Sequence, residues 1–130
     1  MKKLSLLAFV FIWLLLFSVN ISAQSKVRVR FAKGATSATL KGVVAGYKYI
    51  DYIIGAKSGQ TMSVNLKASN ASCSFAMFYS DLKEVADASD VTEVTRNVDV
   101  DDNYVIRVLL PRSAARRKES STFSLKISIK

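Results

Sequence analysis

The sequence contains no histidine, one cysteine (Cys73) and one proline (Pro111). Without histidine it cannot form a Ser/His/Asp hydrolase, a Cys/His protease or a zinc site of ordinary composition. Glycine-rich phosphate loops are also absent. A single cysteine excludes an internal disulfide, and within the alternating segment 73–79 we expect Cys73 to be a small buried apolar residue. The sequence therefore predicts a protein that is not an enzyme, holds no cofactor or metal, and depends on its core for stability.

The N-terminus has the features of a secretion signal. Lys2 and Lys3 precede an apolar run over residues 4–19, and the short stretch Asn20 to Ala23 follows. This order of charge, apolar run and small residues is typical of a cleavable signal peptide, and the run is shorter than the roughly 20 residues that span a bilayer. We expect cleavage after Ala23, which leaves one domain over residues 24–130. Because no cysteine lies near that point, the product is not a lipoprotein, and we expect a periplasmic protein that is free of the membrane.

Positive charge dominates the predicted mature chain. Removing Lys2 and Lys3 leaves 17 basic and 10 acidic residues, a net charge of +7. Eight of the ten acids fall within residues 81–102, whereas the segment 107–118 holds Arg107, Arg112, Arg116, Arg117 and Lys118. A basic exported protein favours anionic partners, such as acidic proteins, peptidoglycan or a membrane surface. Nucleic acid is not an expected partner outside the cytoplasm.

The mature sequence is dominated by a two-residue alternation of apolar and polar side chains. Phe123, Leu125, Ile127 and Ile129, for example, alternate with Ser124, Lys126 and Ser128. This pattern is typical of strands with one buried face. We expect about eight strands, near residues 27–31, 38–44, 47–56, 62–66, 73–79, 93–98, 104–110 and 123–129. Short strands at this spacing predict an all-β, antiparallel two-sheet sandwich or a barrel.

Two segments interrupt the alternation. Residues 81–92 are acidic and weakly helical, and we interpret them as a solvated loop. Residues 111–121 begin at Pro111 and form a connection long enough to suggest a function.

The second of these connections presents two arginines, Arg112 and Arg116, on either side of three small residues. Small residues would let a loop approach a partner closely, and the planar fork of arginine can bind a carboxylate through two hydrogen bonds. The alternative is a solvated basic loop that only keeps the protein soluble. Composition does not decide between the two.

Two weaker patterns in the sequence concern acidic residues. Asp51, together with a carboxylate of the acidic stretch, could form a glycosidase pair, but nothing in the sequence places such a pair in a cleft. Asp99, Asp101 and Asn103 have the spacing of the first calcium ligands of an EF-hand loop, but no glycine follows and Leu110 stands where the bidentate glutamate should be. We interpret them as a polar turn.

Four segments carry a resemblance to a known family. They are Phe31 to Gly34 with Ser37 and Ala38 after it, Gly46 to Tyr52, Ala56 to Gln60, and the C-terminal part from Arg107 to Ile129. Together these segments resemble the periplasmic inhibitors of g-type (goose-type) lysozyme. The similarity runs over nearly the whole mature chain and is collinear, with almost no gaps outside residues 69–100.

The resemblance implies a sandwich of about eight antiparallel strands, akin to bacterial pre-peptidase C-terminal domains. It also implies that the protein blocks g-type lysozyme by inserting a projecting surface patch into the substrate cleft, with no chemistry of its own. The family's motif of Arg, Asn, any residue, Ala and Arg corresponds to residues 112–116, and its surface tyrosine to Tyr47. The implied lysozyme-binding residues, with the adjacent arginine added, are Tyr47, Arg112, Ser113, Ala115, Arg116 and Arg117.

This sequence departs from the family pattern at Ser113, where we expect asparagine. Serine has a shorter side chain with one hydroxyl, so one polar contact is expected to be weaker or bridged by water. The competing hypothesis is a non-catalytic envelope module that binds peptidoglycan or another anionic polymer through the same basic surface. A monomer and a weak dimer both remain open.

Overall fold

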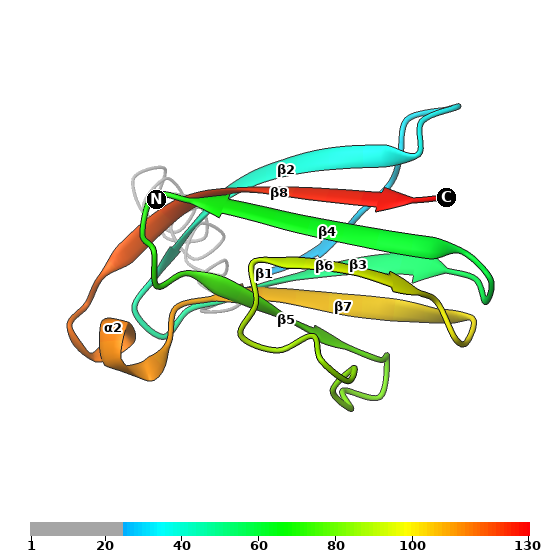
Figure 1. Ribbon diagram of the computed structural model, residues 1–130. Coiled ribbons are helices and arrows are strands. Elements are labelled where there is room, and N and C mark those ends of the chain that lie inside the picture. The colour runs from blue at the N-terminus through cyan, green and yellow to red at the C-terminus, as the bar shows by residue number, and fades with distance from the viewer. Residues whose placement is uncertain (1–24) are drawn as a thin grey trace, which may run out of the picture.

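The computed structural model describes residues 25–130, so the predicted signal peptide lies outside the described residues. Eight strands form two four-stranded sheets, in the orders β1-β3-β7-β5 and β2-β8-β4-β6, which pack face to face (Figure 1). The strands are β1 (Ser25–Arg28), β2 (Ser37–Ala45), β3 (Ile50–Ala56), β4 (Thr61–Ala68), β5 (Ser74–Phe78), β6 (Glu93–Asn97), β7 (Asp102–Leu109) and β8 (Ser120–Ile129). A short helix, α2 (Arg112–Arg116), lies at one end of the sandwich. The predicted β-sandwich of about eight strands is confirmed.

The inner faces of the two sheets form one apolar core, as the alternation predicts. On β8 the side chains of Leu125 and Ile127 are fully buried, while Lys126 between them is exposed. Burying a leucine or isoleucine side chain stabilises the fold by about 1.5–3 kcal/mol. Cys73 is buried in the same core, in agreement with its expected role as a small apolar residue.

Two strands differ in extent from the predictions. β1 ends at Arg28 rather than at Phe31, because only its four residues pair with β3, and they do so in parallel; every other strand pair in residues 25–130 is antiparallel. β3 begins at Ile50 rather than at residue 47, because Gly46 adopts a left-handed φ of 59° and turns the chain.

The acidic segment 81–92 is irregular and contains no helix, as predicted, but it is not fully solvated. Val85 and Ala88 are buried in the core, and single bridges join Glu84 to Phe78 and Val91 to Phe75. The segment therefore covers the edge strand β5, which would otherwise leave unpaired backbone groups exposed.

Tyr104 fastens the turn before β7 to the core. Its hydroxyl donates to the carbonyl oxygen of Val100 at 2.8 Å and also contacts Asp99 Oδ1 at 3.3 Å. This local anchor resembles the tyrosine corner of immunoglobulin-like sandwiches. Burial, followed by the charge of Asp99, raises the pKa of Tyr104 to about 12.

Asp99 and Asp101 lie in a polar turn, as expected, whereas Asn103 already belongs to β7. Asp99 Oδ2 accepts from the Tyr79 hydroxyl at 2.9 Å, and Asp101 Oδ1 accepts from the Ser58 amide at 2.7 Å. Within residues 25–130, no group of three His, Cys, Asp or Glu side chains could hold a metal ion. The carboxylates of this turn serve to join it to its neighbours.

Replacing Tyr104 with phenylalanine should lower the free energy of unfolding at pH 7 by about 1–2 kcal/mol, because the backbone carbonyl of Val100 loses its donor. The folded state keeps the Tyr104 proton up to about pH 12, whereas the unfolded chain releases it near pH 10. The contribution of Tyr104 is thus complete below pH 10 and is lost between pH 10 and 12. Urea unfolding across this range should show a shallower alkaline decline for Tyr104→Phe than for the wild type. The exposed Tyr47→Phe serves as the control, and an equal effect of the two variants would contradict the role of Tyr104.

Candidate protein-binding site

α2 is the element that presents the cationic segment. The sequence predicts a loop here, and that prediction is wrong because Pro111, Ala114 and Ala115 favour a helical turn. Pro111 has a φ of −67° directly before the helix, and its carbonyl oxygen accepts from the Ala115 amide at 2.9 Å. Proline at a helix start and alanine within a helix are both favourable.

The two alanines of α2 point inward. Ala114 is 0% exposed and Ala115 is 2% exposed. The expectation that small residues here allow a close approach to a partner is therefore wrong for the two alanines, whose methyl groups are buried in the protein, whereas Ser113 is exposed. The alanines fix the helix against the rest of the protein.

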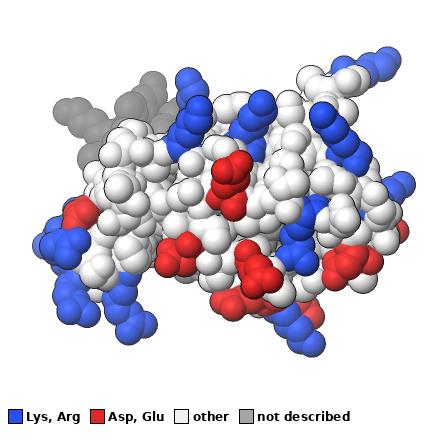
Figure 2. All heavy atoms as spheres, in the orientation of Figure 1, with Lys and Arg blue, Asp and Glu red and all other residues white. Residues whose placement is uncertain are grey.

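Four of the five exposed residues within 112–118 are cationic. Arg112, Ser113, Arg116, Arg117 and Lys118 are all exposed, and Figure 2 shows basic side chains gathered at the end of the molecule where α2 lies. Arg112 and Arg116 are four positions apart, which places them on one side of the helix. Among residues 25–130, neither forms an ion pair with an acidic side chain.

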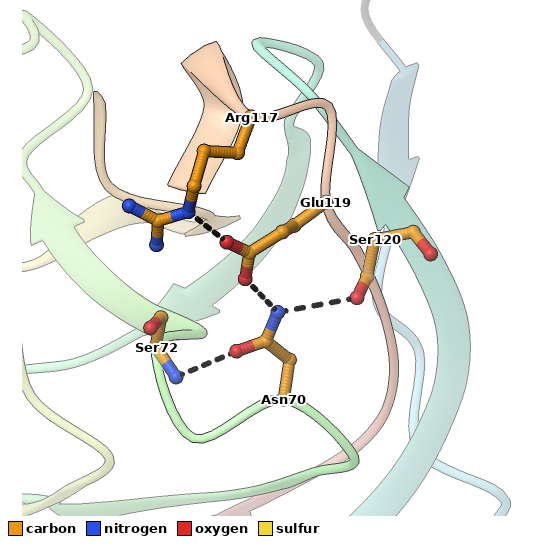
Figure 3. A network of polar contacts seen from close by, with 5 residues as sticks. All are labelled: Asn70, Ser72, Arg117, Glu119 and Ser120. Carbon is orange, nitrogen blue, oxygen red and sulfur yellow. Dashed lines mark hydrogen bonds and ion pairs between the residues drawn. The ribbon is translucent and has the colours of Figure 1, made fainter. Parts of the chain in front are cut away.

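Arg117 differs from the other two arginines because it is engaged within the protein. Its Nε pairs with Glu119 Oε2 at 2.5 Å. Glu119 Oε1 accepts from Asn70 Nδ2 at 2.9 Å, and the same Asn70 nitrogen donates to the Ser120 carbonyl at 3.3 Å. Figure 3 shows this network, which ties the connection after α2 to the connection between β4 and β5.

The Glu119 network also affects the charge of its carboxyl group. The hydrogen bond from Asn70, and after it the one from Arg117, lower the pKa of Glu119. Asn70 itself is held by a hydrogen bond of 2.9 Å from the Ser72 amide to its Oδ1. The sequence does not reveal Asn70 and Glu119 as partners, since 49 positions separate them and no pattern relates the one to the other; the glycosylation-type triplet 70–72 says nothing about Glu119.

Tyr47 lies at the same end of the sandwich. The amide of Gly46 donates to the Glu119 carbonyl at 2.9 Å, so the turn between β2 and β3 is joined to the connection that follows α2. Tyr47 is 68% exposed in this turn. The structure thus brings an exposed aromatic side chain and the exposed arginines to one end of the molecule, although 65 residues separate Tyr47 from Arg112 in the sequence.

Asp51 is part of a second charged pair, on the outer face of the β1-β3-β7-β5 sheet. Arg107 binds both of its carboxylate oxygens, through Nε at 2.8 Å and Nη2 at 3.0 Å, and Asp51 is only 4% exposed. The guanidinium lies 4.0 Å from the centre of the Tyr49 ring and 5.1 Å from that of Phe78. Because Arg107 occupies both oxygens, Asp51 does not act as a glycosidase carboxylate.

The described residues form a small β-sandwich with exposed cations at one end, a surface suited to binding an anionic partner. No family model matches the chain. The inhibitor of g-type lysozyme from Escherichia coli K12 is 30% identical over 138 aligned positions, covering the whole of both chains. The chain belongs to this family of g-type lysozyme inhibitors.

Solved structures agree with this assignment. The crystal structure of PliG from Aeromonas hydrophila, a periplasmic inhibitor of g-type lysozyme, is 34% identical with a TM-score of 0.75, and the match covers 82% of this chain and 97% of that one. The pre-peptidase C-terminal domain of a Bacillus anthracis collagenase shares the fold at 13% identity and a TM-score of 0.57, covering 85% of this chain and all of the other. The resemblance seen in the sequence is thereby confirmed.

The location of the relatives matches the predicted export. PliG of Aeromonas hydrophila is periplasmic, as we expect for this protein. In residues 25–130, no helix is both long and apolar enough to cross a bilayer.

Replacing Arg107 with leucine should destabilise the protein by about 3–5 kcal/mol, because it leaves the buried Asp51 carboxylate without a partner. The double variant Asp51→Leu, Arg107→Leu should recover most of this loss, since it removes both charges together. Urea unfolding of the two single variants and the double variant measures the coupling. If the double variant is as unstable as the sum of the single variants, the pair does not act as a unit.

The Glu119 network predicts a pH dependence of stability. Because the folded-state pKa of Glu119 is lowered, its contribution is present above the ordinary glutamate pKa and is lost as the pH falls through the folded value. Glu119→Ala should therefore lower the urea midpoint at pH 7 and lower it less at pH 3. Glu84→Ala, which removes an exposed glutamate, is the matched control. A loss for Glu119→Ala that is equal at both pH values would contradict the charged network.

Proposed function

We propose that this protein inhibits g-type lysozyme by placing the exposed side of α2, with Tyr47 beside it, in the substrate cleft of the enzyme. The observation that carries the proposal is the pair Arg112 and Arg116, which lie on one side of a helix anchored by buried alanines. The relatives named as inhibitors of g-type lysozyme support the choice of partner.

The chemistry of the proposed contact follows from what a lysozyme must contain. A glycosidase uses carboxyl groups at its reaction centre, so its cleft holds at least one acidic side chain. The fork of Arg112 or Arg116 can bind such a carboxylate through two charge-assisted hydrogen bonds. Occupying the cleft in this way excludes the polysaccharide substrate, and inhibition requires no reaction by the inhibitor.

Rigidity of the site would favour tight binding. Ordering flexible side chains and loops on binding costs free energy, about 0.5–1.5 kcal/mol for each immobilised long side chain. Here the backbone of α2 is already fixed by Ala114 and Ala115, and the connection after it is fixed by Glu119. Arginine and tyrosine are also the residue types that dominate binding energy at protein interfaces.

The remaining candidate residues have different roles in this proposal. Ala115 supports the helix from inside, since its side chain is buried. Arg117 supports the connection after α2 rather than the contact itself, because its guanidinium is paired with Glu119. Ser113 is exposed beside Arg112 and offers a hydroxyl, which reaches a partner less far than an asparagine amide.

Arg112→Ala combined with Arg116→Ala should weaken inhibition of a g-type lysozyme at least tenfold, because truncating interface arginines commonly costs more than 1 kcal/mol each. The thermal midpoint should stay nearly unchanged, since both side chains are exposed. A turbidity assay on bacterial cells with g-, c- and i-type lysozymes side by side measures the effect and the selectivity.

The matched control for this test is Lys41→Ala with Lys126→Ala, which removes the same charge from the outer face of the β2-β8-β4-β6 sheet. It should inhibit as the wild type does. Unchanged inhibition by the arginine variant, or an equal loss for the control, would remove α2 from the mechanism.

Ser113→Asn should strengthen inhibition several-fold, because the amide reaches farther than the hydroxyl and carries its donor and acceptor on two separate atoms. The residue is exposed, so stability should not change. Inhibition constants for the two proteins, measured against the same g-type lysozyme, test this expectation. Equal inhibition would show that this position does not contact the enzyme directly, and weaker inhibition would show that serine fits the contact better than asparagine.

Binding to the anionic polymer of the cell wall is the second candidate, favoured by the same unpaired cations and by the net charge of +7 predicted for the mature chain. A pull-down with purified peptidoglycan sacculi separates the two. Strong, salt-sensitive binding to sacculi together with no effect on lysozyme activity would favour this candidate over inhibition.

A further inference from the structure

A hollow of about 460 Å³ lies on the outer face of the β1-β3-β7-β5 sheet, and α2 does not contribute to it. Two cations of β1 and the apolar side chains of β3 and β7 line it, with Tyr49 and Leu82 among the other lining residues. Ligand sites in proteins are usually clefts of roughly 300–1,000 Å³, apolar for the most part, with a few convergent polar groups. The hollow has this size, and polar and apolar side chains contribute to its lining in similar measure, with Asp51 and Arg107 among the polar ones.

The cations of the hollow are Lys26 and Arg28, two residues apart on β1 and therefore on the same face of the sheet. Arg28 extends over Gly55: a side-chain carbon added at that glycine would lie 3.6 Å from Arg28 Nη2. Lys26 stands opposite Asp51 in the strand register, but Arg107 occupies both oxygens of that carboxylate. Among residues 25–130, neither Lys26 nor Arg28 forms an ion pair, so the hollow carries two uncompensated positive charges.

Apolar groups lie beside these cations. Val105 is buried and Ile53 half-buried on the same face. Leu82 is 58% exposed and has a left-handed φ of 67°, a conformation that costs a residue with a side chain about 1–2 kcal/mol. Its amide donates to the Tyr79 carbonyl at 2.9 Å, which holds Leu82 in place next to the hollow. The hollow thus combines positive charge with an apolar surface fixed beside it.

We propose that this hollow binds a peptide that has a free carboxylate next to small apolar side chains. Lys26 and Arg28 pair with the carboxylate, and Ile53, Val105 and Leu82 contact the side chains. Arg107 does not take part directly, because its fork is filled by Asp51. This site is separate from the proposed lysozyme-binding residues and does not depend on the inhibition of lysozyme.

The proposal is tested by titrating the mature protein with N-acetyl-dialanine as the free acid. Binding is monitored by the amide-proton NMR signals of the protein. The acid should shift the amide signals of Gly55, Ser80 and Asn103 in a saturable manner. The same peptide with an amidated C-terminus should bind at least tenfold more weakly, because it lacks the negative charge. Inorganic phosphate, which has charge but no apolar part, should also bind at least tenfold more weakly.

Lys26→Gln combined with Arg28→Gln should weaken binding of the acid at least tenfold. Lys41→Gln with Lys126→Gln, which makes the same change of charge on the other sheet, should alter it less than twofold. Comparing peptides built from L- and D-alanine distinguishes the C-terminus of a protein from a cell-wall peptide as the source of the ligand.

Three results would overturn the proposal: no saturable shifts around the hollow, equal binding of the acid and its amide, or equal binding by the Lys26→Gln, Arg28→Gln variant and the wild type. If that variant fails to fold, the comparison of acid, amide and phosphate on the wild type still decides. The variant should inhibit lysozyme as the wild type does, so a failure here is distinguishable from a failure of the proposed function.

Discussion

The packing of two sheets against each other, without a disulfide or an identified metal site, is the constraint on which the rest of this structure depends. Leu125 and Ile127 of β8 are fully buried in the core between the sheets. The single cysteine is buried among the same side chains and adds no cross-link. Ala114 of α2 belongs to this core too, so the position of the cationic helix is a direct consequence of how the core is filled.

The arginines discussed above fall into two groups: those paired with a carboxylate inside the protein, and those exposed without an acidic partner in the described part of the chain. Arg107 with Asp51, and Arg117 with Glu119, are paired inside the protein and hold segments together. A buried carboxylate is tolerated only with such a partner, because removing it from water is costly. Arg112 and Arg116 are exposed and, within the described part of the chain, have no acidic partner, which leaves their full hydrogen-bonding capacity for another molecule.

Sequence reasoning was most successful where a short-range pattern carries the information. The alternation in residues 123–129 predicts a strand with one buried face, and β8 has that face. Patterns were less informative where the outcome depends on distant residues. A stretch of Arg, Ser, Ala, Ala and Arg is compatible with a loop or a helix, and the burial of the two alanines decides for the helix.

The sequence by itself determined the fold class, the absence of the usual catalytic groups and the family resemblance, because each of these depends on composition or on local order. Only the tertiary structure decided which cations are free and which side chains meet. Tyr47 and α2 lie at one end of the sandwich because the Gly46 amide bonds to the Glu119 carbonyl. Asn70 reaches Glu119 across 49 positions for a similar reason: β2 and β4 both pair with β8 in one sheet, and this long-range pairing brings together connections that no local pattern relates.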